Sequence, residues 1–233
     1  MRKASQFLIR GLLVICFLAP AAGAAQKIHV IAFGKSISVP WLAEATDIQK
    51  GVQNVVTIKV RPLIVDGRIK EYVLGAPHEI TDRVFTIRRA FRVNDALPDD
   101  SNPRWQWQRG GWILVDRVTG RISPINLPDF DPVYSVVSWY RDYVAYCGVG
   151  EDGKKIYAVV VQVGRRKPVL KKQLSDDGIA ANAPPDSACG PPPWQRNPVR
   201  VSFDVAGSEK QTFAIRGQVV DVVNDAEEDD ESK

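Results

Sequence analysis

The stretch DYVAYCGVGEDGKKIYAVVVQVGRRKPVLKK, residues 142–172, predicts two β-strands that are apolar on both faces. Side chains alternate between the two faces of a strand. In the first strand, Ala145 and Cys147 therefore point one way, while Val144 and Tyr146 point the other way. The second strand, IYAVVVQ, is equally apolar on both sides. A strand that is polar on neither side must be shielded from water on both faces, so we expect this ribbon to lie inside a larger β structure.

Extending the stretch in both directions predicts a four-stranded meander. Its connections, YRD, GEDGK and GRRK, have the lengths of hairpin loops. Lysines at positions 167, 171 and 172 suit a solvent-facing edge for the last strand. The four expected strands are Tyr134–Trp139, Tyr143–Val149, Lys155–Val163 and Pro168–Leu174.

The meander resembles one blade of the TolB-type (WD40-like) periplasmic β-propellers. The residues that match the pattern of that family are Ser138-Trp139, Tyr143-Val144-Ala145-Tyr146 and Ile156-Tyr157. The chain departs from the pattern where Tyr140-Arg141-Asp142 replaces the usual Pro-Asp-Gly turn. GWILVDRVTGRISPI similarly resembles the inner-to-outer hairpin of a blade, with a D-x-x-T-G turn at Asp116–Gly120. The resemblance covers about 60 residues and implies that other sheets cover both faces of the ribbon, as in radially stacked blades.

The rest of the chain also predicts strands and turns. VVTIKVRPLIVDGRIKEYVL reads as a hairpin around Asp66-Gly67, and RVSFDVAGSEKQTFAIRGQVVDVV reads as three short strands. One helix is expected over Pro40–Asn54, and a long Pro- and Ala-rich loop over Ser175–Pro198. The predicted fold class is all-β, with antiparallel meanders in a propeller-like or other multi-sheet fold. A β-sandwich is the alternative.

The N-terminal residues predict export. Residues 1–25 combine a basic start, a short apolar run and a small-residue cleavage site, which are the parts of a secretory signal peptide. The alternatives are an uncleaved anchor and a lipoprotein modified at Cys16. The expected organisation is a signal peptide over 1–25, a single all-β domain over 26–224 and an acidic disordered tail over 225–233. The mature chain is expected to lack a transmembrane span and to be periplasmic or secreted.

Two cysteines, Cys147 and Cys189, remain after removal of the signal peptide. In an oxidising compartment an even pair tends to be joined, so they are candidates for a disulfide. The alternative is a buried strand thiol at Cys147 and an unrelated loop thiol at Cys189.

The charge pattern argues against nucleic acid as a partner. The chain has 31 basic and 27 acidic residues, a net charge of +4. The basic residues are spread along the chain, and several of them leave with the signal peptide. Such a distribution is typical of a solvated surface rather than of a nucleic-acid interface.

No coherent set of catalytic, metal-binding or cofactor-binding residues is found. His29 lies in an apolar strand, and His78 is expected in an exposed loop, so we predict no metal site. Gly34-Lys35-Ser36 lacks the upstream glycine of a phosphate loop, and no G-x-S-x-G motif is present. We therefore expect no catalytic residues and no cofactor, which favours a non-catalytic protein.

The strongest candidates for ligand binding are the tryptophans of PRWQWQRGGW, namely Trp105, Trp107 and Trp112. Exposed aromatic side chains are favoured at binding hot spots, whereas packing in the core is the alternative for these three. The predicted function is an exported binding or scaffold module whose partner is an unknown envelope protein or polysaccharide. The alternative is a carbohydrate-binding or carbohydrate-active protein that uses these tryptophans with Asp99, Asp100 or Asp116.

Overall fold

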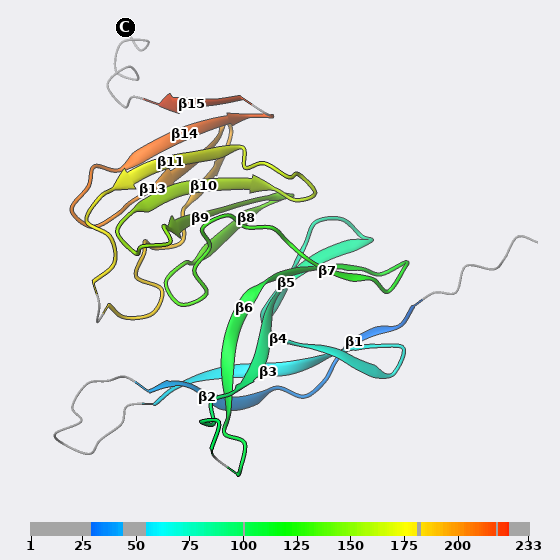
Figure 1. Ribbon diagram of the computed structural model, residues 1–233. Coiled ribbons are helices and arrows are strands. Elements are labelled where there is room, and N and C mark those ends of the chain that lie inside the picture. The colour runs from blue at the N-terminus through cyan, green and yellow to red at the C-terminus, as the bar shows by residue number, and fades with distance from the viewer. Residues whose placement is uncertain (1–28, 44–54, 100, 181–182, 218, 224–233) are drawn as a thin grey trace, which may run out of the picture.

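The computed structural model describes residues 29–43, 55–99, 101–180, 183–217 and 219–223. All regular structure among these residues is β, in three antiparallel sheets (Figure 1), so the all-β prediction is confirmed. The expected signal peptide over 1–25 and the expected acidic tail over 225–233 lie outside the described residues. In Figure 1, one large sheet occupies the lower right, and the two smaller sheets lie together at the upper left.

The large sheet, called the N-terminal sheet below, has the order β1-β3-β4-β5-β6-β7, with β2 paired to the other end of β3. Its β3–β4 hairpin turns at Asp66-Gly67, both with positive φ, as the sequence predicts. Its seven strands are β1 (Ile31–Phe33), β2 (Ile37–Ala43), β3 (Val55–Val65), β4 (Arg68–Glu79), β5 (Val84–Asn94), β6 (Trp105–Asp116) and β7 (Ile122–Pro124).

The helix expected over Pro40–Asn54 is wrong at its start, because β2 continues to Ala43. Val39 and Trp41 are both buried, and β2 forms an antiparallel ladder with β3. The register shifts next to Pro40, which suits a residue that has no backbone N–H to donate. Pairing with β3 therefore overrides the local helical spacing in residues 40–43, and residues 44–54 lie outside the described part of the chain.

The two smaller sheets contain the rest of the strands. The meander sheet has the order β11-β10-β9-β8, which confirms the predicted four-stranded meander. Its strands are β8 (Val137–Tyr140), β9 (Tyr143–Val149), β10 (Ile156–Gln162) and β11 (Leu170–Ser175). The C-terminal sheet has the order β12-β13-β14-β15, with β12 (Trp194–Arg196), β13 (Val199–Phe203), β14 (Gln211–Arg216) and β15 (Val219–Val223). β12 lies within the segment expected to be a loop, at the edge of its sheet.

One face of the β9–β10 ribbon packs on the C-terminal sheet. The buried side chains of this interface alternate along the strands as the sequence predicts. They include Ala145, Cys147, Ile156, Ala158 and Val160 from the ribbon, and Val201, Phe203, Phe213 and Ile215 from the C-terminal sheet. The two sheets together, called the sandwich below, correspond to the β-sandwich alternative for residues 137–223.

The other face of the ribbon is covered by the segment that joins the N-terminal sheet to the sandwich, residues 125–136. Leu127 and Phe130 from this linker pack on a buried cluster that includes Tyr146. The linker is fixed to β9 by hydrogen bonds from the Val149 N–H to the Asp129 oxygen (2.8 Å) and from the Tyr146 hydroxyl to the Pro128 oxygen (2.7 Å). The expectation that sheets cover both faces is therefore wrong, because a hydrogen-bonded linker covers the second face.

Gly148 lets the linker approach β9 this closely. A Cβ at this position would lie 3.1 Å from the Asp129 Cβ and 3.2 Å from its carbonyl oxygen. Both distances are tighter than ordinary contacts to a side chain. A larger residue at this position would therefore require the linker or Val159 to shift by a few tenths of an ångström.

The N-terminal sheet meets the sandwich through stacked aromatic rings. The His78 ring stacks on Trp139 with a centroid distance of 5.0 Å, and its Nε2–H donates to the Arg141 oxygen at 2.7 Å. Trp112 packs edge-on against Trp139 at 5.2 Å. The expectation of an exposed loop for His78 is wrong, because β4 extends to Glu79 and brings this ring to the junction.

Candidate functional site

The three predicted tryptophans lie on one face of β6, but at different points along it. In the ladder with β5, Trp105 pairs with Asn94, Trp107 with Arg92 and Trp112 with Arg88. Their β5 partners are separated by even numbers of residues, so all three share a face. From sequence parity alone, Trp112 would lie on the opposite face from Trp107.

A bulge at Gly110-Gly111 brings Trp112 to this face. Ala90 pairs with Arg109 and Arg88 pairs with Trp112, so two glycines of β6 lie opposite Arg89. An extra residue on one strand shifts its later side chains to the other face. We call the resulting surface, with Trp105, Trp107, Arg109 and Trp112, the tryptophan face.

The outer end of the tryptophan face is open. Trp105 is 57% exposed, whereas Trp107 is half-buried and packs edge-on against Tyr72 at 5.2 Å. The guanidinium of Arg92 lies 5.6 Å from the Trp105 ring and 5.5 Å from the Trp107 ring, within the range of cation–π contact. This end therefore presents two aromatic rings joined by a cation, with one ring exposed.

The inner end of the tryptophan face borders a cavity of about 360 Å³, called the Arg88 cavity below. Its volume lies in the range of small-molecule sites. Arg88 and Arg109 bring guanidinium groups to it, and none of the lining residues is Asp or Glu. The lining residues are Ile58, Lys59, Leu74, Gly75, Ala76, Arg88, Arg109 and Trp112.

Arg88 lies between two irregularities of the sheet. On one side is the Gly110-Gly111 bulge of β6. On the other side, the β4–β5 register shifts between Leu74 and His78, so residues 75–77 lie opposite Ile87. Bulges are over-represented next to functional sites because they re-aim side chains.

The guanidinium of Arg88 is held by backbone oxygens. Its Nη2 donates to the Pro132 oxygen at 2.6 Å, and its Nε donates to the Gly110 oxygen at 3.3 Å. Desolvation by burial, followed by the like charge of Arg109, lowers the pKa of Arg88 to about 10. The group therefore remains a cation at neutral pH, without an ion pair to any carboxylate of the described residues.

Arg109 has a more complete set of partners. Its two terminal nitrogens donate to the two carboxylate oxygens of Asp186, at 2.8 and 2.9 Å. Its guanidinium also lies 4.0 Å from the Trp41 ring. Burial lowers the pKa of Arg109, and Asp186 opposes this effect. Arg109 therefore joins the N-terminal sheet to the segment that precedes β12.

The predicted carboxylates do not gather at the tryptophans. Asp99 is exposed in a turn, and Asp100 lies outside the described residues. Asp116 accepts hydrogen bonds from Arg83, and its pKa is lowered mainly by that contact and further by the backbone N–H groups of Thr119 and Val118. A carboxyl group held ionised in this way is unsuited to act as a general acid.

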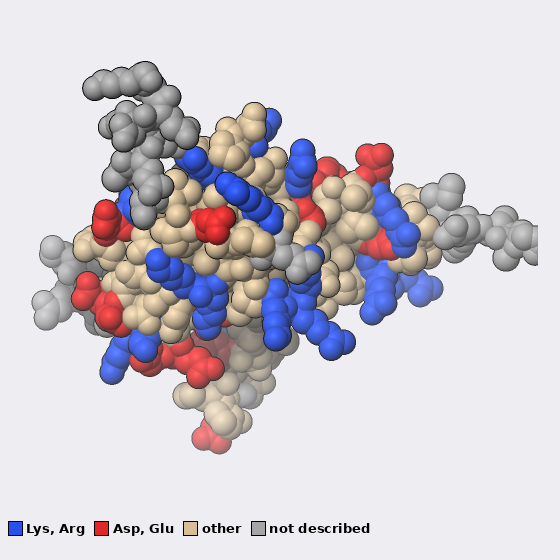
Figure 2. Space-filling model, turned by 90° about the horizontal axis from the view of Figure 1, so that it is seen from above, with Lys and Arg blue, Asp and Glu red and all other residues tan. Residues whose placement is uncertain are grey.

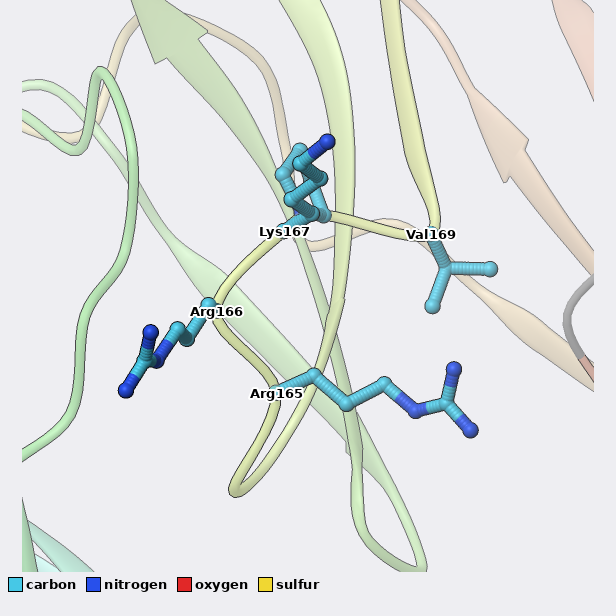
Figure 3. A pocket seen from close by; sticks show the side chains of 5 residues that line it. Arg165, Arg166, Lys167 and Val169 are labelled. Carbon is cyan, nitrogen blue, oxygen red and sulfur yellow. The ribbon is translucent and has the colours of Figure 1, made fainter.

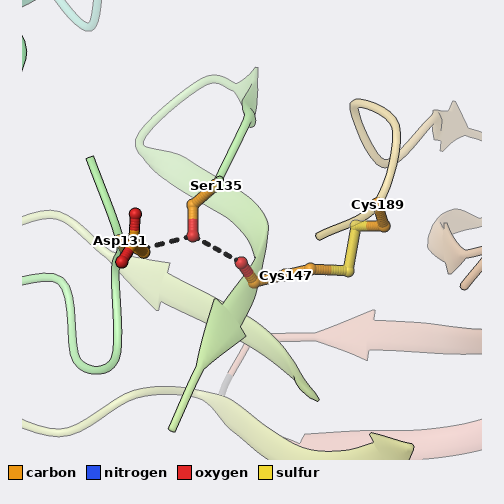
Figure 4. Close-up of a disulfide and its surroundings, with 4 residues drawn as sticks. All are labelled: Asp131, Ser135, Cys147 and Cys189. Carbon is orange, nitrogen blue, oxygen red and sulfur yellow. Dashed lines mark hydrogen bonds between the residues drawn. A yellow bond between two sulfur atoms is a disulfide. The ribbon is translucent and has the colours of Figure 1, made fainter. Parts of the chain in front are cut away.

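The structure joins Cys147 and Cys189 by a disulfide, which links β9 to the segment before β12 (Figure 4). Beside it, the buried hydroxyl of Ser135 donates to the Cys147 oxygen at 2.7 Å and accepts from the Asp131 N–H at 3.1 Å. The first contact ties the linker to the strand that carries the disulfide, and the second lies within the linker. The residues around this disulfide therefore hold the linker and β9 together rather than forming a binding site.

A second concavity, of about 460 Å³, lies at the β10–β11 hairpin. It is lined by residues 165–169, including Arg165, Arg166 and Lys167. Figure 3 shows these three side chains pointing in different directions from the hairpin, so their charges do not converge on one point. This hairpin contributes to a basic surface rather than to a defined site.

Figure 2 shows Lys and Arg side chains spread over the middle of one face of the molecule, with Asp and Glu mainly toward its edges. The described residues contain no group of three or more His, Cys, Asp or Glu side chains placed to hold a metal ion. Over the same residues, no helix has the length and hydropathy needed to cross a membrane.

The sequence singled out the tryptophans but not the arginines beside them. Arg88 and Arg109 come from different strands, and Lys59 comes from a third strand. The sequence feature that could have indicated the site is the pair Gly110-Gly111 within a predicted strand. Glycine inside a strand often marks a bulge or the close approach of another backbone or a ligand. Comparisons with protein-family models, curated proteins and solved structures found no match.

Proposed function

We propose that this chain is an exported, non-catalytic binding module that engages its partner through the outer end of the tryptophan face. The expected partner is an envelope protein or a polysaccharide. The observation that carries the proposal is the exposure of Trp105, which lies in line with Trp107 and next to Arg92.

The chemistry of this end supports binding rather than core packing. An isolated exposed tryptophan leaves a large apolar surface in water. Trp and Arg are also the residue types most enriched at binding hot spots. Trp107 and Tyr72 pack against each other behind Trp105, and such packing limits the freedom that a partner would have to freeze on binding.

A sugar ligand is the second candidate, favoured by the exposure of the Trp105 ring. A pyranose ring presents C–H groups that stack on an aromatic face, and Trp105 is open enough to accept one. The carbohydrate-active form of this candidate has less support, because Asp116 is bound by Arg83. A carbohydrate-binding role without hydrolysis is therefore the form that we retain.

The experiment compares capture of partners by two variants. Trp105→Ala removes the exposed ring, while Ile69→Ser removes a side chain of similar exposure (55%) in the β3–β4 hairpin. Wild-type and variant chains are used as bait in an envelope extract of the producing organism, and the captured proteins and polysaccharides are identified. We expect W105A to lose the captured partner and I69S to retain it.

Equal capture by W105A and the wild type would contradict the proposal. The identity of what is lost separates the two candidates. Loss of a captured protein supports the proposal of a protein-binding module. Loss of a captured glycan supports the sugar-binding candidate, provided that the same glycan quenches tryptophan fluorescence of the chain in solution.

A further inference from the structure

We infer that the Arg88 cavity binds the oxyanion group of a small organic ligand, such as a carboxylate or a phosphate ester, with the attached apolar part of the ligand lying against Trp112. This inference deepens the proposed binding function and rests on it, because it names the chemistry recognised at the inner end of the same tryptophan face. Four observations carry it.

The first observation is the charge of the cavity. Arg88 and Arg109 both line it, and neither Asp nor Glu does. Asp186 forms an ion pair with Arg109 from the sandwich side. Asp186 and Asp131 also favour the charged form of Arg88 through space, but neither forms an ion pair with it. Two guanidinium groups with one ion pair between them therefore give the cavity a positive character.

The second observation is the environment of Arg88. Buried cations in proteins are normally paired, because desolvation of an unpaired charge is costly. Arg88 is instead held by the carbonyl oxygens of Gly110 and Pro132, and Arg109 lies close enough to lower its pKa. An anion in the cavity would offset both the desolvation and the repulsion between the two arginines.

The third observation is the number of donors that Arg88 has left. A guanidinium has five N–H groups and no acceptor. The two contacts to backbone oxygens use Nε and Nη2. No described residue accepts a hydrogen bond from Nη1. Two N–H groups on one nitrogen are therefore available to an oxyanion, which arginine recognises better than lysine does.

The fourth observation is the shape and polarity of the walls. Ile58, Leu74 and the indole of Trp112 supply apolar surface, while the Gly75-Ala76 bulge supplies backbone without a large side chain. A site that combines mostly apolar walls with a few polar groups is typical of small-molecule binding. A bare inorganic ion would leave most of about 360 Å³ unfilled, so an organic anion fits better.

The test uses the purified chain and four probes: phenyl phosphate, benzoate, inorganic phosphate and phenol. Binding is measured by calorimetry, and its place is found from the indole N–H resonance of Trp112, assigned with the Trp112→Phe variant. We expect phenyl phosphate or benzoate to bind and to shift the Trp112 resonance. Inorganic phosphate should bind more weakly, and phenol should not bind measurably. The stronger of the two aromatic anions decides between a phosphate ester and a carboxylate.

The variants change one side chain at a time. Arg88→Lys keeps the charge but loses the planar donor set, and should weaken anion binding on the order of tenfold, as expected for loss of one charged contact. Arg68→Lys, at an exposed arginine of the same sheet outside the cavity, is the matched control and should bind like the wild type.

Binding of none of the anions, or equal binding by the wild type and R88K, would overturn the inference. A Trp112 resonance that does not move while calorimetry reports binding would also overturn it, since the anion would then lie elsewhere. These outcomes are separable from failure of the proposed function. Capture of a partner through Trp105 can be lost or kept in W105A whatever R88K does to anion binding.

Discussion

Three arginines in or next to the N-terminal sheet have different partners. Arg83 lies at the surface and forms an ion pair with Asp116. Arg109 lies between the Trp41 ring and the carboxylate of Asp186. Arg88 has two backbone oxygens and the Phe130 ring as partners. At the residue scale, Arg88 is the one of the three with the capacity to recognise an anion from outside the chain.

The Asp116–Arg83 contact predicts a specific response to acid. The folded pKa of Asp116 is lowered, mainly by Arg83, relative to an unfolded value of about 3.9. A lowered pKa stabilises the folded state fully above the unfolded value, and this stabilisation is lost as the pH falls toward the folded value. In urea unfolding measured from pH 7 to pH 2, we expect Asp116→Asn to be less stable than the wild type at pH 7, with the difference shrinking below about pH 4. A difference that stays constant across that range would contradict the assignment.

The Arg109–Asp186 pair predicts measurable coupling between the N-terminal sheet and the sandwich. Arg109 is largely buried and its contact with Asp186 is bidentate. A double-mutant cycle with Arg109→Met and Asp186→Asn should give a coupling energy between about 0.5 and 3 kcal/mol. The more exposed Arg89–Glu71 pair is the control and should give a smaller value. Additive effects of R109M and D186N would show that the contact does not hold the two parts together.

At the scale of the element, β6 is the strand that organises the candidate site. Its outer part carries Trp105 and Trp107, and its inner part carries Trp112 next to the Arg88 cavity. The Gly110-Gly111 bulge keeps both parts on one face while Ile113 and Val115 enter the core on the other face. The extra residue in the bulge, rather than the side chains around it, therefore determines that Trp112 lies on the same face as Trp105 and Trp107.

This role of the bulge predicts different outcomes for two changes at one residue. A Cβ at Gly111 would contact nothing within 4 Å, and this glycine has no positive φ, so Gly111→Ala should shift the thermal midpoint little. Deletion of Gly111 removes the extra residue and turns one half of β6 to the wrong face. We expect the deletion to lower the midpoint severely or to prevent folding. A deletion variant as stable as G111A would contradict the assigned register.

Elements with a local signal were predictable from the sequence. The Asp66-Gly67 hairpin and the four-stranded meander follow from turn residues and from alternation along each strand. The face on which Trp112 lies was not predictable from the sequence, because a bulge interrupts the alternation of side chains along β6. The start of the expected helix at Pro40 was wrong for a similar reason, since pairing with β3 is a long-range contact that spacing within residues 40–54 does not reveal.

At the scale of the whole molecule, the linker at residues 125–136 has two structural roles. It covers the second apolar face of the β9–β10 ribbon through Leu127 and Phe130. It also supplies the Pro132 oxygen that holds Arg88. Covering the ribbon and completing the wall of the Arg88 cavity are therefore linked through one segment of chain.

The disulfide should stabilise the sandwich. It joins residues that are 42 positions apart, and both cysteines are buried. In the chain-entropy account, loss of a bridge closing a loop of this size costs about 3–4 kcal/mol. The double variant Cys147→Ala with Cys189→Ala should lower the free energy of unfolding in urea by roughly that amount. An unchanged unfolding midpoint would contradict a stabilising bridge.

The candidate site could be predicted only in part, because its residues come from separate strands. The tryptophans are close in sequence and belong to a residue type that is common at binding sites, so the sequence alone identified them as candidates. Lys59, Arg88 and Arg109 meet only after β3, β4, β5 and β6 pair in order. Strand order is set by long-range contacts, and nothing in the composition marks these three cations among the 31 basic residues.

The central claim is that the linker seals the second face of the ribbon, and Tyr146 reports on it most directly. Its side chain is fully buried and its hydroxyl donates to the Pro128 oxygen. Burial, followed by the charge of Asp129, raises the pKa of Tyr146 above its ordinary value of 10.0. The measurement is an NMR titration of ring-labelled tyrosine, with Tyr146 assigned by the Tyr146→Phe variant. The account predicts that the Tyr146 resonance does not move through the range around pH 10 while the chain stays folded. Ionisation of Tyr146 with an ordinary midpoint in the folded chain would contradict it.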